Sequence, residues 1–150
     1  MNNELEGCVI DFNQIKSHLE EIEFKLATDL NIKSNTRQSL IELDIGDKLP
    51  NNELVEDWRA TYSSFLESEN FRHSVLSFRD EIKSSSTEDN AAYQKIIKRA
   101  LTYINSDDLR HALDIPKPTL LSWTSGYHLP FPLIRKSVFK IIIEKLEALV

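Results

Sequence analysis

The residues of this sequence that could carry catalysis or bind a metal are four histidines, one cysteine and two adjacent aspartates. No histidine shows the His-x-x-x-His or Glu-x-x-His spacing that places two metal ligands on one face of a helix. The carboxylates of Asp107 and Asp108 would point about 100° apart on a helix, which is unsuitable for a paired acid/base site. Cys8 has no base near it in sequence, and one cysteine forms neither a disulfide framework nor a cysteine-based zinc cage. We therefore expect no enzyme and no metal.

The positions of the glycines and the length of the apolar runs argue against a nucleotide-binding or membrane-spanning protein. Gly7, Gly46 and Gly126 stand too far apart to form a phosphate-binding loop, so we expect no nucleotide cofactor. The start of the chain is acidic, with Glu4 and Glu6, and lacks the basic-then-apolar layout of a secretory signal. No apolar run approaches the roughly 20 residues that span a bilayer. We expect a cytoplasmic protein without a membrane partner.

The charge of the chain is unevenly distributed. Its 150 residues are 28% charged and 41% hydrophobic, which is typical of a folded globular protein, and the net charge is -6. Residues 1–90 hold 9 Lys and Arg against 19 Asp and Glu, whereas residues 91–150 hold 9 against 5. The polar stretch Lys83–Asp89 predicts a linker, and therefore an acidic domain over 1–86 and a second domain over 87–150. The basic C-terminal segment would suit a polyanionic partner.

The acidic N-terminal region is predicted to be mostly helical. From Asp11 to about Leu30, apolar residues recur at alternating steps of three and four, which is typical of a helix with one buried stripe. The stripe consists of Phe12, Ile15, Leu19, Ile22 and Leu26. Residues 40–45 alternate apolar and acidic side chains, which favours a short strand. Two further helices are predicted, one opening after Asn52 and a separate one over residues 71–82. We expect this region to serve dimerisation or partner binding.

The last sixty residues have the pattern helix, turn, helix, loop, helix. Residues 91–104 are amphipathic, and Ser106 is expected to cap a short second helix. Asp114–Pro116 is predicted as a turn, because proline bars helix and pushes the residue before it toward extended geometry. A third helix is expected over residues 118–125, closed by Gly126 as a left-handed cap. Two short helices joined by a turn of this length form the helix-turn-helix layout.

Residues 109–123 (Leu-Arg-His-Ala-Leu-Asp-Ile-Pro-Lys-Pro-Thr-Leu-Leu-Ser-Trp) resemble the two-helix signature of the phage-repressor, Cro-like helix-turn-helix domains. The usual pattern there is Leu-Ala-x-x-Leu-Gly-Val-Ser-x-x-Thr-Val-Ser-x-Trp. The residues on its core positions are Leu109, Leu113, Ile115, Thr119, Leu120 and Trp123. Residues 123–126 match the family's Trp-x-Ser-Gly, and Pro130 matches the proline four residues later. The resemblance covers residues of about 90–145 and implies a mainly α protein ending in a Cro/lambda-repressor-like helix-turn-helix bundle.

The resemblance also implies a function, namely sequence-specific binding of double-stranded DNA by a transcriptional regulator. The helix around 117–125 would enter the major groove. The residues expected to contact bases are Lys117, Pro118, Leu121 and Ser122. Those expected to contact phosphates are Ser106, Thr119, Tyr127, His128, Arg135 and Lys136.

The final helix, Pro132 to Val150, carries more apolar residues than one buried stripe requires. Its surplus apolar face is predicted to pack on the acidic region or on a second copy, which favours a homodimer. A dimer would suit DNA, because a two-fold protein reads two half-sites.

A second function stays open. The protein could be an interaction module, similar to an antitoxin or an antirepressor, whose helix-turn-helix no longer binds DNA. Asp107, Asp108 and Pro116 stand at positions that should favour phosphates, and the acidic residues 1–86 could bind a basic protein.

Overall fold

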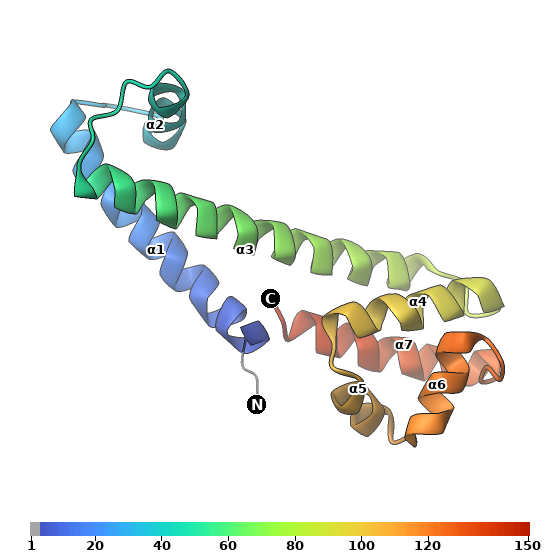
Figure 1. Cartoon of the computed structure of the whole chain (residues 1–150). Coiled ribbons are helices and arrows are strands. Elements are labelled where there is room, and N and C mark those ends of the chain that lie inside the picture. The colour runs from blue at the N-terminus through green and yellow to red at the C-terminus, as the bar shows by residue number, and fades with distance from the viewer. Residues whose placement is uncertain (1–3) are drawn as a thin grey trace. The chain divides into compact units, whose positions relative to one another are not determined.

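The computed structural model describes the backbone of residues 4–150 and the side chains of residues 12–150. The side chains of Cys8, Glu4 and Glu6 lie outside this description. Residues 4–150 form seven helices and no strand (Figure 1), so the protein is mainly α. The chain divides into two compact units, Met1–Phe71 and Arg72–Val150.

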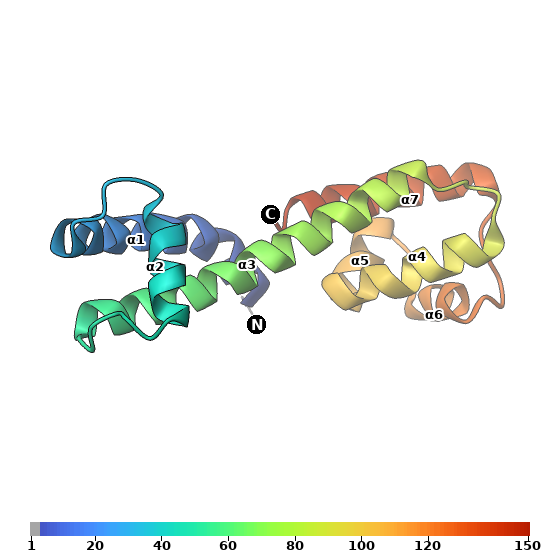
Figure 2. The ribbon, with the colours of Figure 1, turned by 90° about the horizontal axis from the view of Figure 1, so that it is seen from above.

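The first unit contains α1 (Glu4–Leu30), α2 (Thr36–Ile45) and the first part of α3 (Glu53–Ser84). α1 lies beside the first part of α3, and α2 packs on α1 (Figures 1 and 2). The predicted stripe of α1 is confirmed, because it faces the core of this unit. The buried core consists of Leu19, Ile22, Leu26, Leu40, Leu49, Val55, Trp58 and Phe65, with Phe12 and Ile15 partly buried against it.

One buried carboxylate joins the three helices of the first unit. Glu23 is only 6% exposed. Its oxygens accept hydrogen bonds from Nε and Nη2 of Arg37 at 2.8 and 2.9 Å, and from Nε1 of Trp58 at 3.1 Å. The hydrogen bond to Glu23 raises the pKa of the Arg37 guanidinium. A buried charge needs such partners to offset its desolvation.

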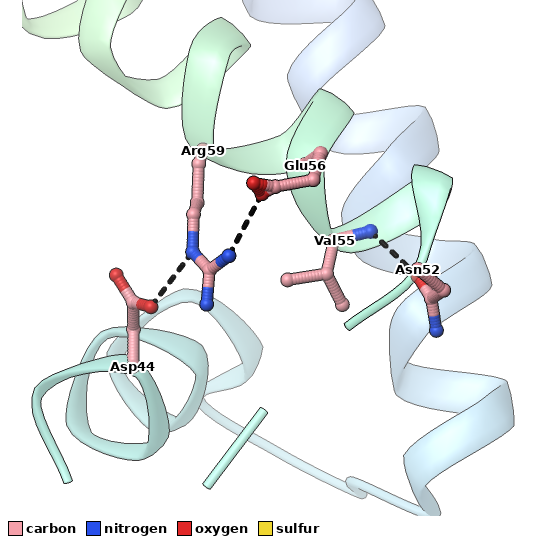
Figure 3. A network of polar contacts seen from close by, with 5 residues as sticks. All are labelled: Asp44, Asn52, Val55, Glu56 and Arg59. Carbon is pink, nitrogen blue, oxygen red and sulfur yellow. Dashed lines mark hydrogen bonds and ion pairs between the residues drawn. The ribbon is translucent and has the colours of Figure 1, made fainter. Parts of the chain in front are cut away.

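A second polar network fixes α2 against the start of α3 (Figure 3). Arg59 of α3 donates from Nε to Asp44 of α2 at 2.9 Å and from Nη1 to Glu56 at 2.8 Å. The Asn52 side chain accepts from the backbone N–H of Val55 at 2.9 Å, which caps the first turn of α3.

The predicted strand over residues 40–45 is wrong, because these residues form the second half of α2. Leu40 is fully buried and Leu43 is packed against the same core, three residues further on. Ile45 is 82% exposed. The pattern of apolar and acidic side chains over these six residues also fits a helix with one apolar side. The packing of this side on α1 stabilises the helix over a strand.

The two helices predicted over the middle of the chain form one continuous helix, α3, of 32 residues. No glycine or proline interrupts it. The compact units divide within α3, before Arg72, whereas we predicted a linker at Lys83–Asp89. The reason is that the end of α3 packs with later residues. Phe78 stacks on Tyr103 with ring centres 5.8 Å apart, and Arg99 lies 4.7 Å over the Phe78 ring.

The second unit contains the end of α3, α4 (Asn90–Tyr103), α5 (Ser106–Leu113), α6 (Lys117–Ser125) and α7 (Pro132–Glu147). α4 packs on α6 and α7, and α5 packs on the same two helices (Figure 1). Tyr93 of α4 lies at the centre, with its ring 5.8 Å from that of Trp123 and 5.6 Å from that of Phe139. This core holds the short helices α5 and α6.

Candidate nucleic-acid interface

The start of α5 is fixed by an asparagine cap. The side-chain oxygen of Asn105 accepts from the backbone N–H of Asp107 at 2.8 Å and of Asp108 at 3.4 Å. We predicted Ser106 as this cap, which is wrong. Ser106 is the first residue of the helix and is exposed. An asparagine before the first turn supplies the required acceptor.

The predicted turn between α5 and α6 is confirmed. Asp114 adopts a left-handed conformation (φ 56°), and its N–H donates to the carbonyl of His111 at 3.1 Å. The N–H of Ile115 donates to the carbonyl of Arg110 at 3.1 Å. Pro116 is extended (ψ 161°) and precedes the first residue of α6. Three residues therefore separate the two short helices.

α6 is anchored at its core side and at its end. Leu120 and Trp123 are buried. Gly126 closes the helix with φ 75°, as predicted, and the side-chain amide of Gln94 in α4 donates to the carbonyl of Thr124 at 2.9 Å. A Cβ at Gly126 would lie 2.7 Å from the side-chain oxygen of Gln94. The left-handed backbone conformation therefore favours glycine, and a Cβ here would displace the end of the Gln94 side chain.

The four residues predicted to contact bases lie on the outward side of α6, opposite the buried Trp123. Lys117 and Pro118 are exposed, Leu121 is 57% exposed and Ser122 is half-buried at the edge. The helical repeat of 3.6 residues gives them one common face. We name this set, Lys117, Pro118, Leu121 and Ser122, the α6 outer face.

The residues predicted to contact phosphates separate into two groups. The exposed ones are Ser106, Tyr127, His128 and Lys136. The rings of Tyr127 and His128 pack on each other with their centres 4.5 Å apart. Thr119 is half-buried and lies on the side of α6 away from the outer face.

Arg135 is not available to a phosphate, and that prediction is wrong. Its side chain is 4% exposed. The guanidinium donates to the carbonyl of Pro130 at 2.8 Å, to the carbonyl of Thr87 at 2.9 Å and to the side-chain oxygen of Asn90 at 2.7 Å. It also lies 5.0 Å over the ring of Tyr93. Arg135 is therefore a structural residue that joins α7 to the start of α4.

We did not identify from the sequence a long segment around α6 that contains no acidic residue. No Asp or Glu occurs over residues 115–143, which hold Lys117, Arg135, Lys136 and Lys140. A count of charge along the chain would have found this segment. None of the three lysines forms an ion pair with any side chain in the described part of the chain. We name residues 115–143 the acid-free segment.

The same segment exposes large apolar side chains. They are Leu121 (57%), Tyr127 (77%), Phe131 (78%), Leu133 (85%) and Ile134 (49%). The last helix was predicted to carry more apolar residues than its buried stripe needs. Its exposed apolar side chains lie in its first turn and in the loop before it.

An open pocket of about 330 Å³ lies between α1 and α3 in the first unit. It is lined by Gln14, Ile15, His18, Ala60, Thr61 and Ser64. His18 lies 3.3 Å from Asp57. Among the side chains of residues 12–150, no group of three or more His, Cys, Asp or Glu could hold a metal ion. No helix in the described part of the chain is long and apolar enough to cross a membrane.

Comparison of the chain with protein-family models, with curated proteins and with solved structures found no match.

Proposed function

We propose that the second unit binds double-stranded DNA sequence-specifically, with α6 in the major groove, as part of a dimeric transcriptional regulator. The observation that carries this proposal is the α6 outer face, which begins with Lys117 and lies in the acid-free segment. A short helix of this kind fits the width of the major groove. Lysines that form no ion pair with a described side chain favour approach to phosphates.

Five polar residues of α6 and of the segment after it then have a role. Lys117 would donate to the O6 and N7 of guanine or to a phosphate, and the Ser122 hydroxyl would bond to a base edge. Tyr127, His128 and Lys136 follow α6 and would contact the backbone on either side of the groove. These backbone contacts would set the position of the helix, and the outer face would supply sequence preference.

The dimer is proposed from the exposed apolar residues at the start of α7. Phe131, Leu133 and Ile134 lie within four residues of one another and expose much of their side chains. A second copy packed on them would remove this apolar surface from water. The resulting two-fold protein would place two α6 helices on half-sites about 34 Å apart.

A protein-binding function is the second candidate, and two observations favour it. Asp107 and Asp108 are exposed at the start of α5, where a phosphate would meet two carboxylates. In addition, residues 1–71 hold 15 Asp and Glu against 6 Lys and Arg. A basic protein would bind such a unit through charge complementarity.

The experiment that separates the candidates is selection of DNA from a randomised duplex library with the full chain, followed by a mobility-shift titration. If α6 lies in the major groove (the groove model), the selection should enrich a sequence that the wild type binds more tightly than unrelated duplexes. The Lys117→Ala/Ser122→Ala variant should lose this preference, while Lys33→Ala, an exposed lysine of the first unit, should retain it. If no duplex is enriched and none shifts in the titration, the proposal fails, and the protein-binding function becomes the better-supported candidate.

A further inference from the structure

The α6 outer face offers few hydrogen-bonding groups to a base. α6 contains no arginine, asparagine or glutamine, the side chains that make paired hydrogen bonds to guanine or adenine. The Thr124 hydroxyl donates to the carbonyl of Leu121 at 2.8 Å, and the Ser125 hydroxyl donates to the carbonyl of Ser122 at 3.0 Å. Lys117 and Ser122 are the polar side chains that the face leaves for a partner.

Apolar atoms dominate the same face. Leu121 is 57% exposed, and Pro118 is exposed one turn before it. The anchoring of α6 through Trp123 and through the Gln94 hydrogen bond holds this leucine outward at a fixed position. In the major groove, the C5-methyl group of thymine is the apolar feature that distinguishes one base pair from another.

We infer that Leu121 reads thymine methyl groups, with Pro118 beside it, so that the preferred DNA carries thymine beneath this part of α6. This inference rests on the proposed function of α6. Lys117 lies one turn before Leu121 and supplies the charge that holds the helix near the phosphates or a guanine. Recognition through a methyl group differs from recognition through hydrogen bonds because it is lost when thymine is replaced by uracil, which lacks only that methyl.

The test uses the duplex enriched by selection with the full chain, resynthesised with deoxyuridine in place of one thymine at a time. At one or two positions, the change should weaken binding about fourfold, the effect of removing one buried methyl group. Leu121→Ala should bind the thymine and uracil duplexes equally at those positions. Leu66→Ala is the matched control, because this leucine is 38% exposed and lies in the first unit, outside the proposed DNA and dimer contacts, and it should keep the fourfold difference.

Two results would overturn the inference, and they differ in what they say of the proposed function. An enriched duplex that binds tightly but responds to no uracil substitution would reject methyl recognition and leave groove binding in place. Failure of selection to enrich any duplex would reject both. Thermal unfolding of Leu121→Ala must match that of the wild type, which the exposure of this side chain leads us to expect.

Discussion

The guanidinium of Arg135 donates a 2.7 Å hydrogen bond to the side-chain oxygen of Asn90 and thereby joins the first turn of α7 to the first turn of α4. The same group donates to the carbonyls of Thr87 and Pro130. One arginine therefore connects three separate segments of the second unit, and the loop that follows α6 is one of them.

Arg135→Ala should lower the free energy of unfolding by about 2 to 4 kcal/mol, because it leaves partly buried acceptors without donors. Urea unfolding followed by circular dichroism measures the effect. Lys136→Ala is the neighbouring exposed control and should change stability by less than about 0.5 kcal/mol. Equal effects of the two substitutions would show that the Arg135 contacts do not stabilise the unit.

Gly126→Ala should destabilise the protein by about 1 to 2 kcal/mol or more, since the left-handed conformation is costly for a residue with a Cβ. The added methyl would also meet the Gln94 side chain. Gly46→Ala is the comparison, because Gly46 has an ordinary φ of -81° and its nearest contact would be at 3.4 Å. Thermal unfolding should show the larger loss for Gly126→Ala, and the reverse order would contradict this account of the cap.

Tyr93→Phe should leave stability at neutral pH unchanged or raise it by about 1 kcal/mol. The Tyr93 hydroxyl is buried and has no hydrogen-bond partner among the described residues, so its removal orphans no other group. The variant should keep the ring packing against Trp123 and Phe139.

The same substitution should change the alkaline limit of stability. Burial raises the pKa of Tyr93 above its usual value, so the folded protein keeps its proton at a pH where the unfolded chain releases it. Stability is therefore fully present below about pH 10 and falls above it, by at most about 1.4 kcal/mol per pH unit from this group. Urea titrations between pH 8 and pH 11 should give a shallower loss for Tyr93→Phe than for the wild type. Parallel curves would contradict the raised pKa.

If the groove model is correct, Lys117→Ala should reduce mainly the sequence preference of DNA binding, and Lys136→Ala should reduce the affinity for all sequences. Where Lys117 contacts a base, its loss should weaken binding to the selected sequence by about 1 to 3 kcal/mol and weaken binding to unrelated DNA less. Lys136 would contact phosphates, so its loss should weaken both about equally. Anisotropy titrations with one selected and one unrelated duplex make the comparison. A uniform loss for both variants would remove Lys117 from base recognition.

Local signals allowed much of the fold to be predicted. The α1 stripe, the turn at Asp114–Pro116 and the cap at Gly126 follow from periodicity and from the backbone limits of proline and glycine. The strand prediction over residues 40–45 failed because six alternating residues fit either a strand or one side of a helix. Contact with α1 decides between them, and that contact is not visible in the local pattern.

The candidate site was also predictable only where local patterns determine it. The α6 outer face follows from helical periodicity once the limits of the helix are known. The burial of Arg135 depends on Thr87, which is 48 residues away in sequence, and no local pattern indicates that contact. The asparagine cap of α5 was missed because Asn105 and Ser106 are both good capping residues in adjacent positions.

The salt dependence of DNA binding tests the central claim most directly. Fluorescence anisotropy of the full chain with a selected duplex, between roughly 50 and 200 mM salt, gives the slope of log K against log salt concentration. If Lys136 neutralises one phosphate while Lys117 contacts a base, the slope should be about -1 per protomer, and Lys136→Ala should reduce its magnitude by about one. A slope near zero, or no binding at high micromolar protein, would contradict the account.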